Sequence, residues 1–350
     1  MIQTSFVCQT LSVLALSACS FRAGAASVDA SDLPPPGPSL LRPAMGEALP
    51  PTRALLLWQD LEAVTGRAIR DYEICSTTGA MESIDEDSEC PASKTATGTY
   101  LVLDPLQAGV ASLWKVRGRF EDGGLSAWSA VGAFTPDNSL VAWLRLNGDA
   151  TDSSVGGHNG ALQNGAGFGA GIDAQALQLD GTNDYTDLGG GLALPGALTV
   201  SAWIYGNGTP ASADSGIVNQ GNLNYALTSH TDGRVYFYIG DGTNNLRASV
   251  SPGTWHHVAG TFNGTTDPDG MRFYLDGALA GMKASSTATT GATGDLWIGR
   301  YSASHFNGGI DNVTLYDGAL SEAAVLNEYC ATLAAGAAGG IDPLPAPCQP

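Results

Sequence analysis

The sequence predicts an all-β protein made of two packed β-sandwiches, and three observations support this. Glycine accounts for 46 of the 350 residues, and chains rich in glycine and short polar residues are typical of strands joined by tight turns. Runs in which apolar and polar residues alternate recur along most of the chain. Helical spacing is clear only at Ser321–Tyr329, near the C-terminus, so helices contribute little to the predicted fold.

The N-terminus carries the features of an export signal. The apolar run Phe6–Leu16 is too short to span a bilayer but has the length of a secretory signal core. Leu16–Cys19 resembles the lipobox of bacterial lipoproteins, so we assign residues 1–19 to a signal peptide and predict that Cys19 becomes the lipidated first residue. The segment before the apolar run lacks lysine and arginine, and cleavage after Ala25 is the alternative. We expect an exported protein that is lipid-anchored in the bacterial cell envelope, at the outer membrane or surface, or otherwise periplasmic or secreted.

The cysteines fit an oxidising compartment. Two of the six lie in the predicted signal, and the four that remain are an even number, which in an exported chain indicates disulfides. Pairing between nearest neighbours predicts the bridges Cys75–Cys90 and Cys330–Cys348. The absence of any CxxC motif makes a zinc site unexpected.

The charge balance excludes some classes of partner. The formal net charge is −19, and only 15 residues are lysine or arginine. A nucleic-acid-binding protein needs basic patches, so nucleic acid is excluded as a partner. An anionic membrane is disfavoured for the same reason, and we expect membrane contact only through the lipid anchor.

A proline-rich linker, residues 20–51, leads to a first predicted domain at 52–136. About seven short apolar runs separated by turns predict an immunoglobulin-like sandwich there. Trp58, the turn Leu103–Leu106 and the pair of stretches WKVR and SAWS resemble a fibronectin type III domain. Ala111–Leu113 departs from that pattern, because the family usually has a tyrosine in this stretch. The acidic loop between Cys75 and Cys90 is read as a solvated surface loop.

Residues 137–335 form the second predicted domain, followed by a disulfide-tied tail at 336–350. Clean alternation at Leu198–Tyr205 and Val235–Ile239 indicates strands with one core face and one outer face. Asp276-Gly277 after a strand is a strong hairpin signal. About a dozen such strands without a helix until the end require two large packed sheets.

The second domain resembles a known family. The stretches that carry the resemblance are LVAWLRLNGDATDSSVGGHNGAL, ALQLDGTNDYTDLG, LTVSAWIY, TWHHVAGTF, FYLDG, LWIGR and FNGGIDNVTLYDGALSEAAV. They occur in the order found in laminin G-like domains, which are concanavalin A-like jelly rolls. The resemblance implies a non-catalytic module that recognises a carbohydrate, or a glycosylated or extracellular protein. A structural or adhesion scaffold of the cell envelope is the alternative.

Catalysis is not expected. Glycoside hydrolases on this fold need a pair of carboxylates about 5 Å apart when they retain configuration. The second domain contains only Glu322 and Glu328, and both lie in the predicted helix. A serine triad is poorly supported, because no GxSxG occurs. His256 and His257 are read as structural residues on opposite faces of one strand.

Aromatic and amide side chains make the candidate ligand site. Tyr236 and Tyr238 point away from their aliphatic neighbours, as do Trp203 and Tyr205, so they are expected on outer faces. Two loops add short polar, cationic and aromatic groups. The full candidate set is Tyr205, Asn222, Tyr225, Tyr236, Tyr238, Arg300, Tyr301 and His305. The alternative is that the aromatics only stabilise the sheets by cross-strand pairing.

Asp311 is the basis of a predicted structural calcium site. Strand periodicity places it on the same face as Val313 and Leu315, which are expected core residues. A carboxylate in that position needs a partner, and Ca²⁺ with oxygen ligands could supply one. In related jelly rolls an Asp at this point often binds calcium, and this resemblance adds Asp149, Asp152, Asp180 and Gly181 as candidate ligands. The alternative is that backbone N–H groups bond the Asp311 carboxylate.

Overall fold

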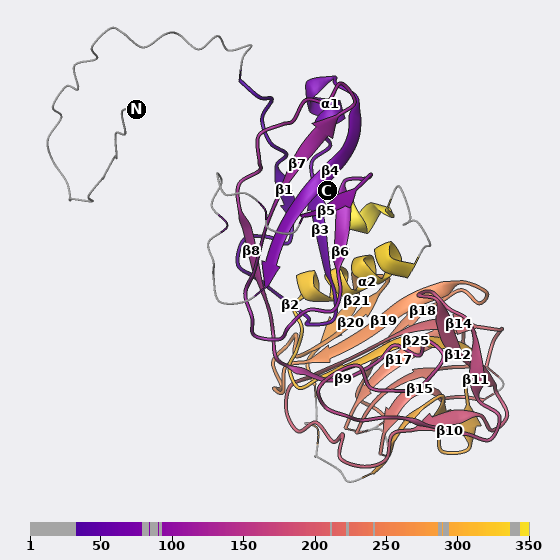
Figure 1. Ribbon diagram of the computed structural model, residues 1–350. Helices are drawn as coiled ribbons and strands as arrows, with labels where there is room; N and C mark the ends of the chain where they lie inside the picture. The colour runs from indigo at the N-terminus through magenta and orange to yellow at the C-terminus, as the bar shows by residue number, and fades with distance from the viewer. Residues whose placement is uncertain are drawn as a thin grey trace, which may run out of the picture. The chain divides into compact units, whose positions relative to one another are not determined.

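Four β-sheets make up most of the fold of this computed structural model (Figure 1). The structure describes residues 33–78, 84, 90, 93–210, 212–221, 224–240, 242–285, 289, 294–336 and 344–349. Cys19 and Asn222, two predicted site residues, lie outside this set. The chain separates into residues 1–34 and a second compact unit, Pro35–Pro350, to which all that follows belongs.

The first sandwich combines a three-stranded sheet, in the order β1-β3-β6, with a five-stranded sheet, in the order β2-β8-β7-β4-β5. Trp58, Tyr72 and Trp114 pack together in its core. Its elements are β1 (Leu40–Arg42), β2 (Glu47–Leu49), β3 (Ala54–Trp58), α1 (Leu61–Thr65), β4 (Ile69–Thr78), β5 (Ser93–Ala96), β6 (Tyr100–Leu103), β7 (Ser112–Phe120) and β8 (Gly132–Pro136). The strands β1 and β2 lie in the predicted linker, whose extent was therefore overestimated. Each is three residues long, too short for alternation to be read.

The second sandwich packs a nine-stranded sheet against an eight-stranded sheet. The nine-stranded sheet has the order β10-β13-β22-β15-β16-β17-β18 with β23 and β24 beside it, and the eight-stranded sheet has the order β11-β12-β25-β14-β19-β20-β21 with β9 beside it. The strands are β9 (Leu140–Leu144), β10 (Ala161–Gln163), β11 (Gly167–Ala170), β12 (Gln175–Asp180), β13 (Tyr185–Asp187), β14 (Leu198–Gly206), β15 (Ser215–Gln220), β16 (Tyr225–Ser229), β17 (Arg234–Ile239), β18 (Asn245–Ser249), β19 (Trp255–Phe262), β20 (Met271–Leu275), β21 (Ala278–Lys283), β22 (Leu296–Ile298), β23 (Arg300–Tyr301), β24 (Ser304–His305) and β25 (Asn307–Tyr316). The predicted all-β sandwich fold is thus confirmed.

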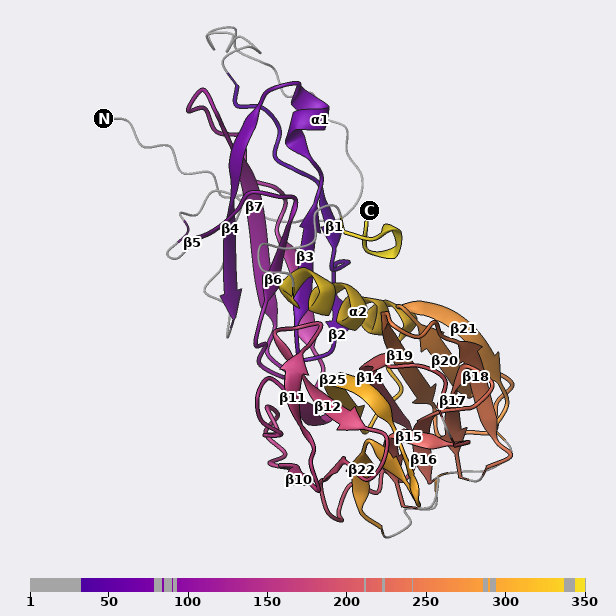
Figure 2. The same cartoon turned by 90° about the vertical axis from the view of Figure 1, so that its right-hand side faces the viewer.

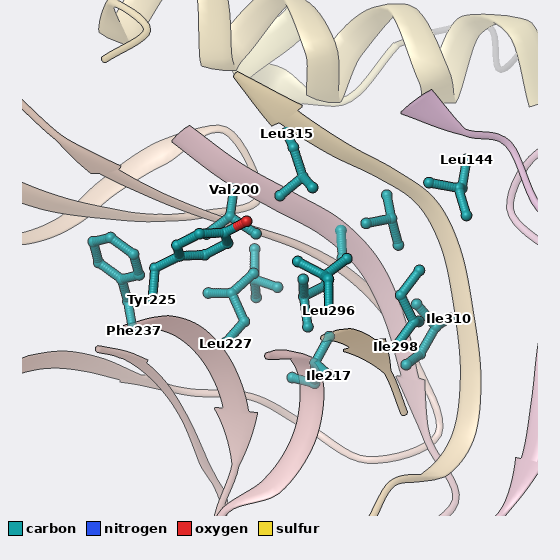
Figure 3. Close-up of a cluster of buried hydrophobic side chains, with 14 of the residues drawn as sticks. Leu144, Val200, Ile217, Tyr225, Leu227, Phe237, Leu296, Ile298, Ile310 and Leu315 are labelled. Atoms are coloured by element: carbon teal, nitrogen blue, oxygen red, sulfur yellow. The ribbon is translucent and has the colours of Figure 1, made fainter. Parts of the chain in front are cut away.

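The core of the second sandwich lies between its two sheets (Figure 3). Val200 and Leu315 reach into it from the eight-stranded sheet, and Leu227 and Phe237 reach into it from the nine-stranded sheet. The faces predicted for β14 and β17 are therefore correct, because the aliphatic residues of both strands point into this core. Asp276-Gly277 joins β20 to β21 with positive φ at both residues, as the hairpin prediction requires.

A β-bulge in β25 reverses the predicted orientation of Asp311. Ser201 of β14 pairs with Thr314, whereas Trp203 pairs with Asp311, so β25 has one more residue than β14 over this stretch. The bulged residue Asn312 has φ 45°. Ile310 and Val313, three residues apart, both enter the core. Asp311 therefore shares the outer face with Trp203, and the prediction that it shares a face with the core residues of its strand is wrong.

Helix α2 (Glu322–Gly336) covers part of that outer face and lies between it and the first sandwich (Figure 2). Asn327 of α2 donates from Nδ2 to the carbonyl of Arg53 at 2.7 Å and accepts from the backbone N–H of Leu55 at 3.1 Å. The buried Arg53 guanidinium also forms ion pairs with Asp104 and Asp173. The two sandwiches are therefore joined by buried polar contacts within one compact unit.

Both predicted disulfides, Cys75–Cys90 and Cys330–Cys348, are confirmed. The second ties α2 to the short 3-10 helix η2 (Ala346–Cys348). None of the helices in the described residues combines the length and the apolar character needed to cross a membrane.

Candidate functional site

A groove on the outer face of the eight-stranded sheet is built around two aromatic side chains, Tyr205 and Trp255. Tyr205 follows the core residue Ile204 on β14, so strand alternation turns it outward. Trp255 is its direct cross-strand partner on β19. Their ring centroids lie 5.6 Å apart with an interplanar angle of 52°, and both rings are partly exposed. The pair forms an aromatic wall that solvent can reach.

Gly309 forms the floor beside this wall. It lies in register between Tyr205 of β14 and Gln178 of β12, in the middle of the sheet. A Cβ at this position would lie 2.8 Å from the Trp255 ring and 3.3 Å from Nε2 of Gln178. Both side chains therefore lean over the glycine, and only glycine leaves room for them.

The groove is open to solvent and has a free volume of about 420 Å³. It is lined by Gly169, Ala170, Gln178, Tyr205, Asn207 and Trp255. None of these six residues carries a charge. Asn207 donates from Nδ2 to Oδ1 of Asn307 at 3.0 Å. Within the described residues, the Tyr205 hydroxyl and the Asn207 Oδ1 atom make no hydrogen bond, so both can serve a ligand. Apolar rings beside uncharged hydrogen-bonding groups are suited to a neutral polar ligand with an apolar face.

Of the predicted ligand residues that the structure describes, only Tyr205 lies in this groove. The alternation of residues along β19 could have shown that Trp255 faces outward. Its position beside Tyr205 depends on the register between β14 and β19, which the sequence does not show. Gln178 and Gly309 are brought together by the pairing of β12 with β25, which the sequence does not reveal.

Tyr236 and Tyr238 face outward from the nine-stranded sheet as predicted, but they are 6% and 5% exposed. Their rings stack with centroids 5.7 Å apart, and Tyr301 packs against them. The Tyr236 hydroxyl donates to Asp232 at 2.8 Å, and that of Tyr238 donates to Asp214 at 2.9 Å. These side chains stabilise the sheet, which is the alternative considered from the sequence.

Tyr225 lies in the core of the second sandwich, fully buried, and its hydroxyl donates to the carbonyl of Leu192 at 2.6 Å. Its assignment as a ligand residue is therefore corrected. The sequence suggested a loop residue, whereas Tyr225 begins β16 and its side chain follows the core-facing phase of that strand.

Arg300 and His305 form a separate cluster on the nine-stranded sheet. The Arg300 guanidinium lies 4.3 Å from the ring centroid of Trp297 and 4.7 Å from that of Tyr185. The ring of His305 lies 6.2 Å from that of Tyr185. The predicted ligand residues with described positions are thus divided between the two sheets and do not form a single site.

Asp311 is completely buried and bonded to nearby N–H groups. It accepts from the backbone N–H groups of Ile172 at 3.0 Å and Asp173 at 3.2 Å, and from Nδ2 of Asn312 at 3.0 Å. Burial raises the pKa of Asp311 to about 7, and the negative charge of Asp173 acts in the same direction. This bonding matches the alternative read from the sequence, in which backbone N–H groups bond the carboxylate.

The carboxylates of the other predicted calcium ligands bond to backbone N–H groups close to them in the fold. Asp152 accepts from the backbone N–H groups of Trp143, Ser154 and His158 at 2.8 to 2.9 Å, Asp149 accepts from that of Thr151, and Asp180 from that of Thr182. Gly181, with φ 76°, completes the turn after Asp180. Asp180 pairs with Asn307, four residues and roughly 13 Å along β25 from Asp311. No group of three acidic, histidine or cysteine side chains arranged for a metal occurs in the described residues, and calcium binding stays a prediction.

Solved structures with a similar fold come from several kinds of protein. Domain 4 of the extracellular arabinanase AbnA from Geobacillus stearothermophilus, in complex with arabinotriose, is 19% identical with a TM-score of 0.45, covering 54% of this chain and 97% of that chain. The binding domain of Botulinum neurotoxin DC, in complex with rat synaptotagmin II, is 13% identical with a TM-score of 0.44, covering 55% and 52%. A Trypanosoma rangeli sialidase is 12% identical with a TM-score of 0.39, covering 63% and 43%. The likeness at these identities concerns the fold alone.

The family comparison concerns the second sandwich. No curated protein sequence matches the chain. Residues 180–326, which include Tyr205, Asn207 and Trp255 of the groove and most strands of the second sandwich, match the family model described as the concanavalin A-like lectin/glucanases superfamily.

Proposed function

We propose that the chain is an exported binding module that holds a neutral carbohydrate in the groove of Tyr205 and Trp255. The observation that carries this proposal is the partly exposed pair of aromatic rings, one of which packs over Gly309, where the absence of a side chain leaves room for it. A sugar ring has an apolar face of C–H groups that packs on aromatic rings, while its hydroxyls can bond the amides of Gln178 and Asn207. The groove provides both kinds of contact within one surface.

The charge distribution favours a neutral ligand over an acidic one. Uronic or sialic acids are usually held by arginine or lysine, and neither lines the groove. The net charge of −19 also repels polyanions at long range. We therefore expect neutral glycans to bind more tightly than acidic ones.

Cleavage of glycosidic bonds does not accompany binding in this proposal. Hydrolysis of that kind uses two carboxylates on either side of the scissile bond. The residues that line the groove include none. Glu328 belongs to α2 and its side chain is buried against the sheet, and Glu322 starts that helix. These placements support a binding role rather than a glycosidase role.

The remaining parts of the chain support presentation of the groove at the cell envelope. The two disulfides suit an oxidising compartment outside the cytoplasm. The lipobox-like Leu16–Cys19 supports a lipid anchor, and the fibronectin-like first sandwich would hold the second sandwich away from it. Intact-mass measurement of membrane-extracted protein should give a chain that begins at acylated Cys19, whereas a free N-terminus at Ala26 would support simple secretion.

The binding proposal is tested with the full disulfide-bonded chain on an array of neutral and acidic glycans, followed by calorimetry on the best ligand. Tyr205→Ala and Trp255→Ala should each weaken binding by about 10-fold or more, a loss of about 1.4 kcal/mol. Tyr185→Ala is the matched control, because it removes a partly exposed aromatic from the other sheet. If only the control variant loses binding, the glycan binds at the cluster of Arg300 and Tyr185 and not in the groove. A folded chain that binds no glycan would favour the envelope scaffold.

A further inference from the structure

A second pocket opens at the rim of the second sandwich, where the ends of β14 and β17 meet the turn between β18 and β19. Its free volume is about 50 Å³, so the pocket is small and has room only for a short apolar group. Apolar walls come from Ile204, Val250, Pro252 and Phe306. Ser251 and His256 lie at this pocket and belong to neither the groove nor the core.

Ser251 and His256 of this pocket are joined by hydrogen bonds to each other and, through His256, to Asp276 behind it. Oγ of Ser251 lies 2.9 Å from Nε2 of His256, and Nδ1 of His256 lies 2.9 Å from Oδ2 of Asp276. The other carboxylate oxygen of Asp276 accepts from the backbone N–H of His257 at 2.9 Å, so the carboxylate is fixed in place. Ser251 is exposed, so its hydroxyl is open to a ligand in the pocket.

The hydrogen-bond pattern determines which imidazole nitrogen carries the proton. The backbone N–H of Ser251 donates to Nε2 of His256 at 3.3 Å, and an N–H group can only donate. Nε2 must therefore present its lone pair, and Nδ1 holds the proton that is donated to Asp276. This is the tautomer in which a histidine can take a proton from a serine hydroxyl.

We propose that Ser251, His256 and Asp276 form a nucleophilic site that cleaves esters of small apolar acyl groups. Oγ of Ser251 attacks the acyl carbonyl carbon while its proton passes to Nε2 of His256. The ester C–O bond then breaks, and the leaving alcohol takes the proton from Nε2. Water, activated by the same nitrogen, releases the acyl group as a carboxylic acid and restores the serine. Asp276 is a positioning residue, because it holds the imidazole in the required tautomer.

Ser229 gives the pocket a further polar group. It is 5% exposed, and its hydroxyl has no hydrogen-bond partner in the described residues. A buried hydroxyl without a partner is unfavourable, so a ligand oxygen bonded there would relieve it. Ser229 lines the same pocket, and in the proposal its hydroxyl, once the side chain turns toward the ligand, donates to the carbonyl oxygen of the bound ester. The apolar walls accommodate the acyl chain beside it.

This inference departs from the expectation that the chain is not an enzyme, and it does not rest on carbohydrate binding. That expectation concerned paired carboxylates and the GxSxG turn. Here the serine lies in the connection between β18 and β19, which belong to different sheets, and its partners come from β19 and from the β20–β21 hairpin. Spacings of five and twenty residues between the three side chains have no recognisable motif.

The test uses the full disulfide-bonded chain and a fluorophosphonate probe, with which Oγ forms a bond to phosphorus as fluoride leaves. Intact mass and peptide mapping should show one adduct, at Ser251. The chain should also hydrolyse p-nitrophenyl acetate or butyrate faster than buffer. Ser251→Ala should lose the adduct and reduce ester turnover by about 10³-fold or more. Ser249→Ala, which removes an exposed hydroxyl outside the pocket, should retain both.

Two results would overturn the proposal. The first is a folded wild-type chain that gains no adduct and hydrolyses these esters no faster than buffer. The second is labelling and turnover that persist unchanged in Ser251→Ala. Either would mean that the serine and histidine only stabilise the turn before β19. His256→Gln provides a second variant if the serine variant fails to fold, and it should lose turnover in the same way.

Discussion

Raising the pH from 6 to 8 should remove about 3 kcal/mol of the stability that two buried carboxyl groups contribute, because both must then lose their protons. Burial raises the pKa of Asp311 to about 7 and that of Glu328 to about 7. Glu328 points from α2 toward the sheet, where the hydroxyls of Ser201 and Thr314 donate to its carboxyl at 3.2 Å and that of Tyr316 also bonds to it. No cation forms an ion pair with either carboxyl in the described residues.

The sign and size follow from linkage between proton binding and folding. The ordinary values are 3.8 for Asp311 and 4.5 for Glu328, so the folded state binds both protons more tightly than the unfolded state does. That contribution to the free energy of unfolding is complete below the unfolded pKa and is lost as the pH rises through the folded pKa. Between pH 6 and pH 8 each group loses about 1.4 kcal/mol.

Denaturant unfolding of the full chain at pH 6, 7 and 8 measures this loss. Glu328→Gln keeps the shape of the side chain but cannot ionise, so it should remove about half of the pH-dependent decrease. Glu322→Gln is the control, because Glu322 is exposed on the same helix. The hydrogen bond to Asp276 raises the pKa of His256, which adds a loss of the same sign, whereas burial lowers the pKa of His257 to about 4, which adds a gain of the opposite sign. The variants are therefore compared with one another. Equal decreases in wild type and Glu328→Gln would refute the reasoning.

Three further predictions concern the groove, the contact between the sandwiches and calcium. Gly309→Ala should weaken glycan binding by about 10-fold, because the new methyl group displaces the ring of Trp255. Gly281→Ala is the control and should leave the affinity unchanged, because its methyl group makes only ordinary contacts. Calorimetry measures both affinities. Asn327→Ala should cost about 3 kcal/mol in denaturant unfolding, because it leaves the N–H of Leu55 and a carbonyl unpaired in a buried place. If the predicted site exists, calcium at a hundredfold excess over its Kd should stabilise the folded chain by about 2.7 kcal/mol. Melting temperatures that change with neither calcium nor chelator, in both wild type and Asp311→Asn, would rule that site out.

The parts of the fold that were predictable are those in which a strand has two different faces. In β14 and β17 one face is aliphatic and the other is aromatic or polar, so period 2 alone identifies the core side. The disulfides followed from the number and order of four cysteines. Asp311 was misplaced because the bulge at Asn312 shifts the phase of β25, and a residue in that conformation has no clear signature in one sequence.

The candidate sites were less predictable because they depend on register between distant strands. The groove needs Gln178 opposite Gly309 and Tyr205 opposite Trp255, pairs separated by 50 or more positions in the chain. Alternation shows which face a residue occupies but not which residue of another strand lies beside it. For Tyr236 the outward direction was predicted correctly, but its burial was not, because the sequence does not show that Tyr301 packs against it.

The contacts between the sandwiches also decide how the functional sites should be studied. Arg53 of the first sandwich is 3% exposed and pairs with Asp104 of its own sandwich and Asp173 of the second. Removing the first sandwich would leave Asp173 without its cation and Asn327 of α2 without both of its backbone partners. A buried group that loses its partner costs more than the original bond contributed. Asp173 also donates its N–H to Asp311, so the damage would extend to the strand that supplies the groove floor. We therefore expect one cooperative unfolding transition for Pro35–Pro350, and lower stability and weaker glycan binding for a fragment that begins at Asp137.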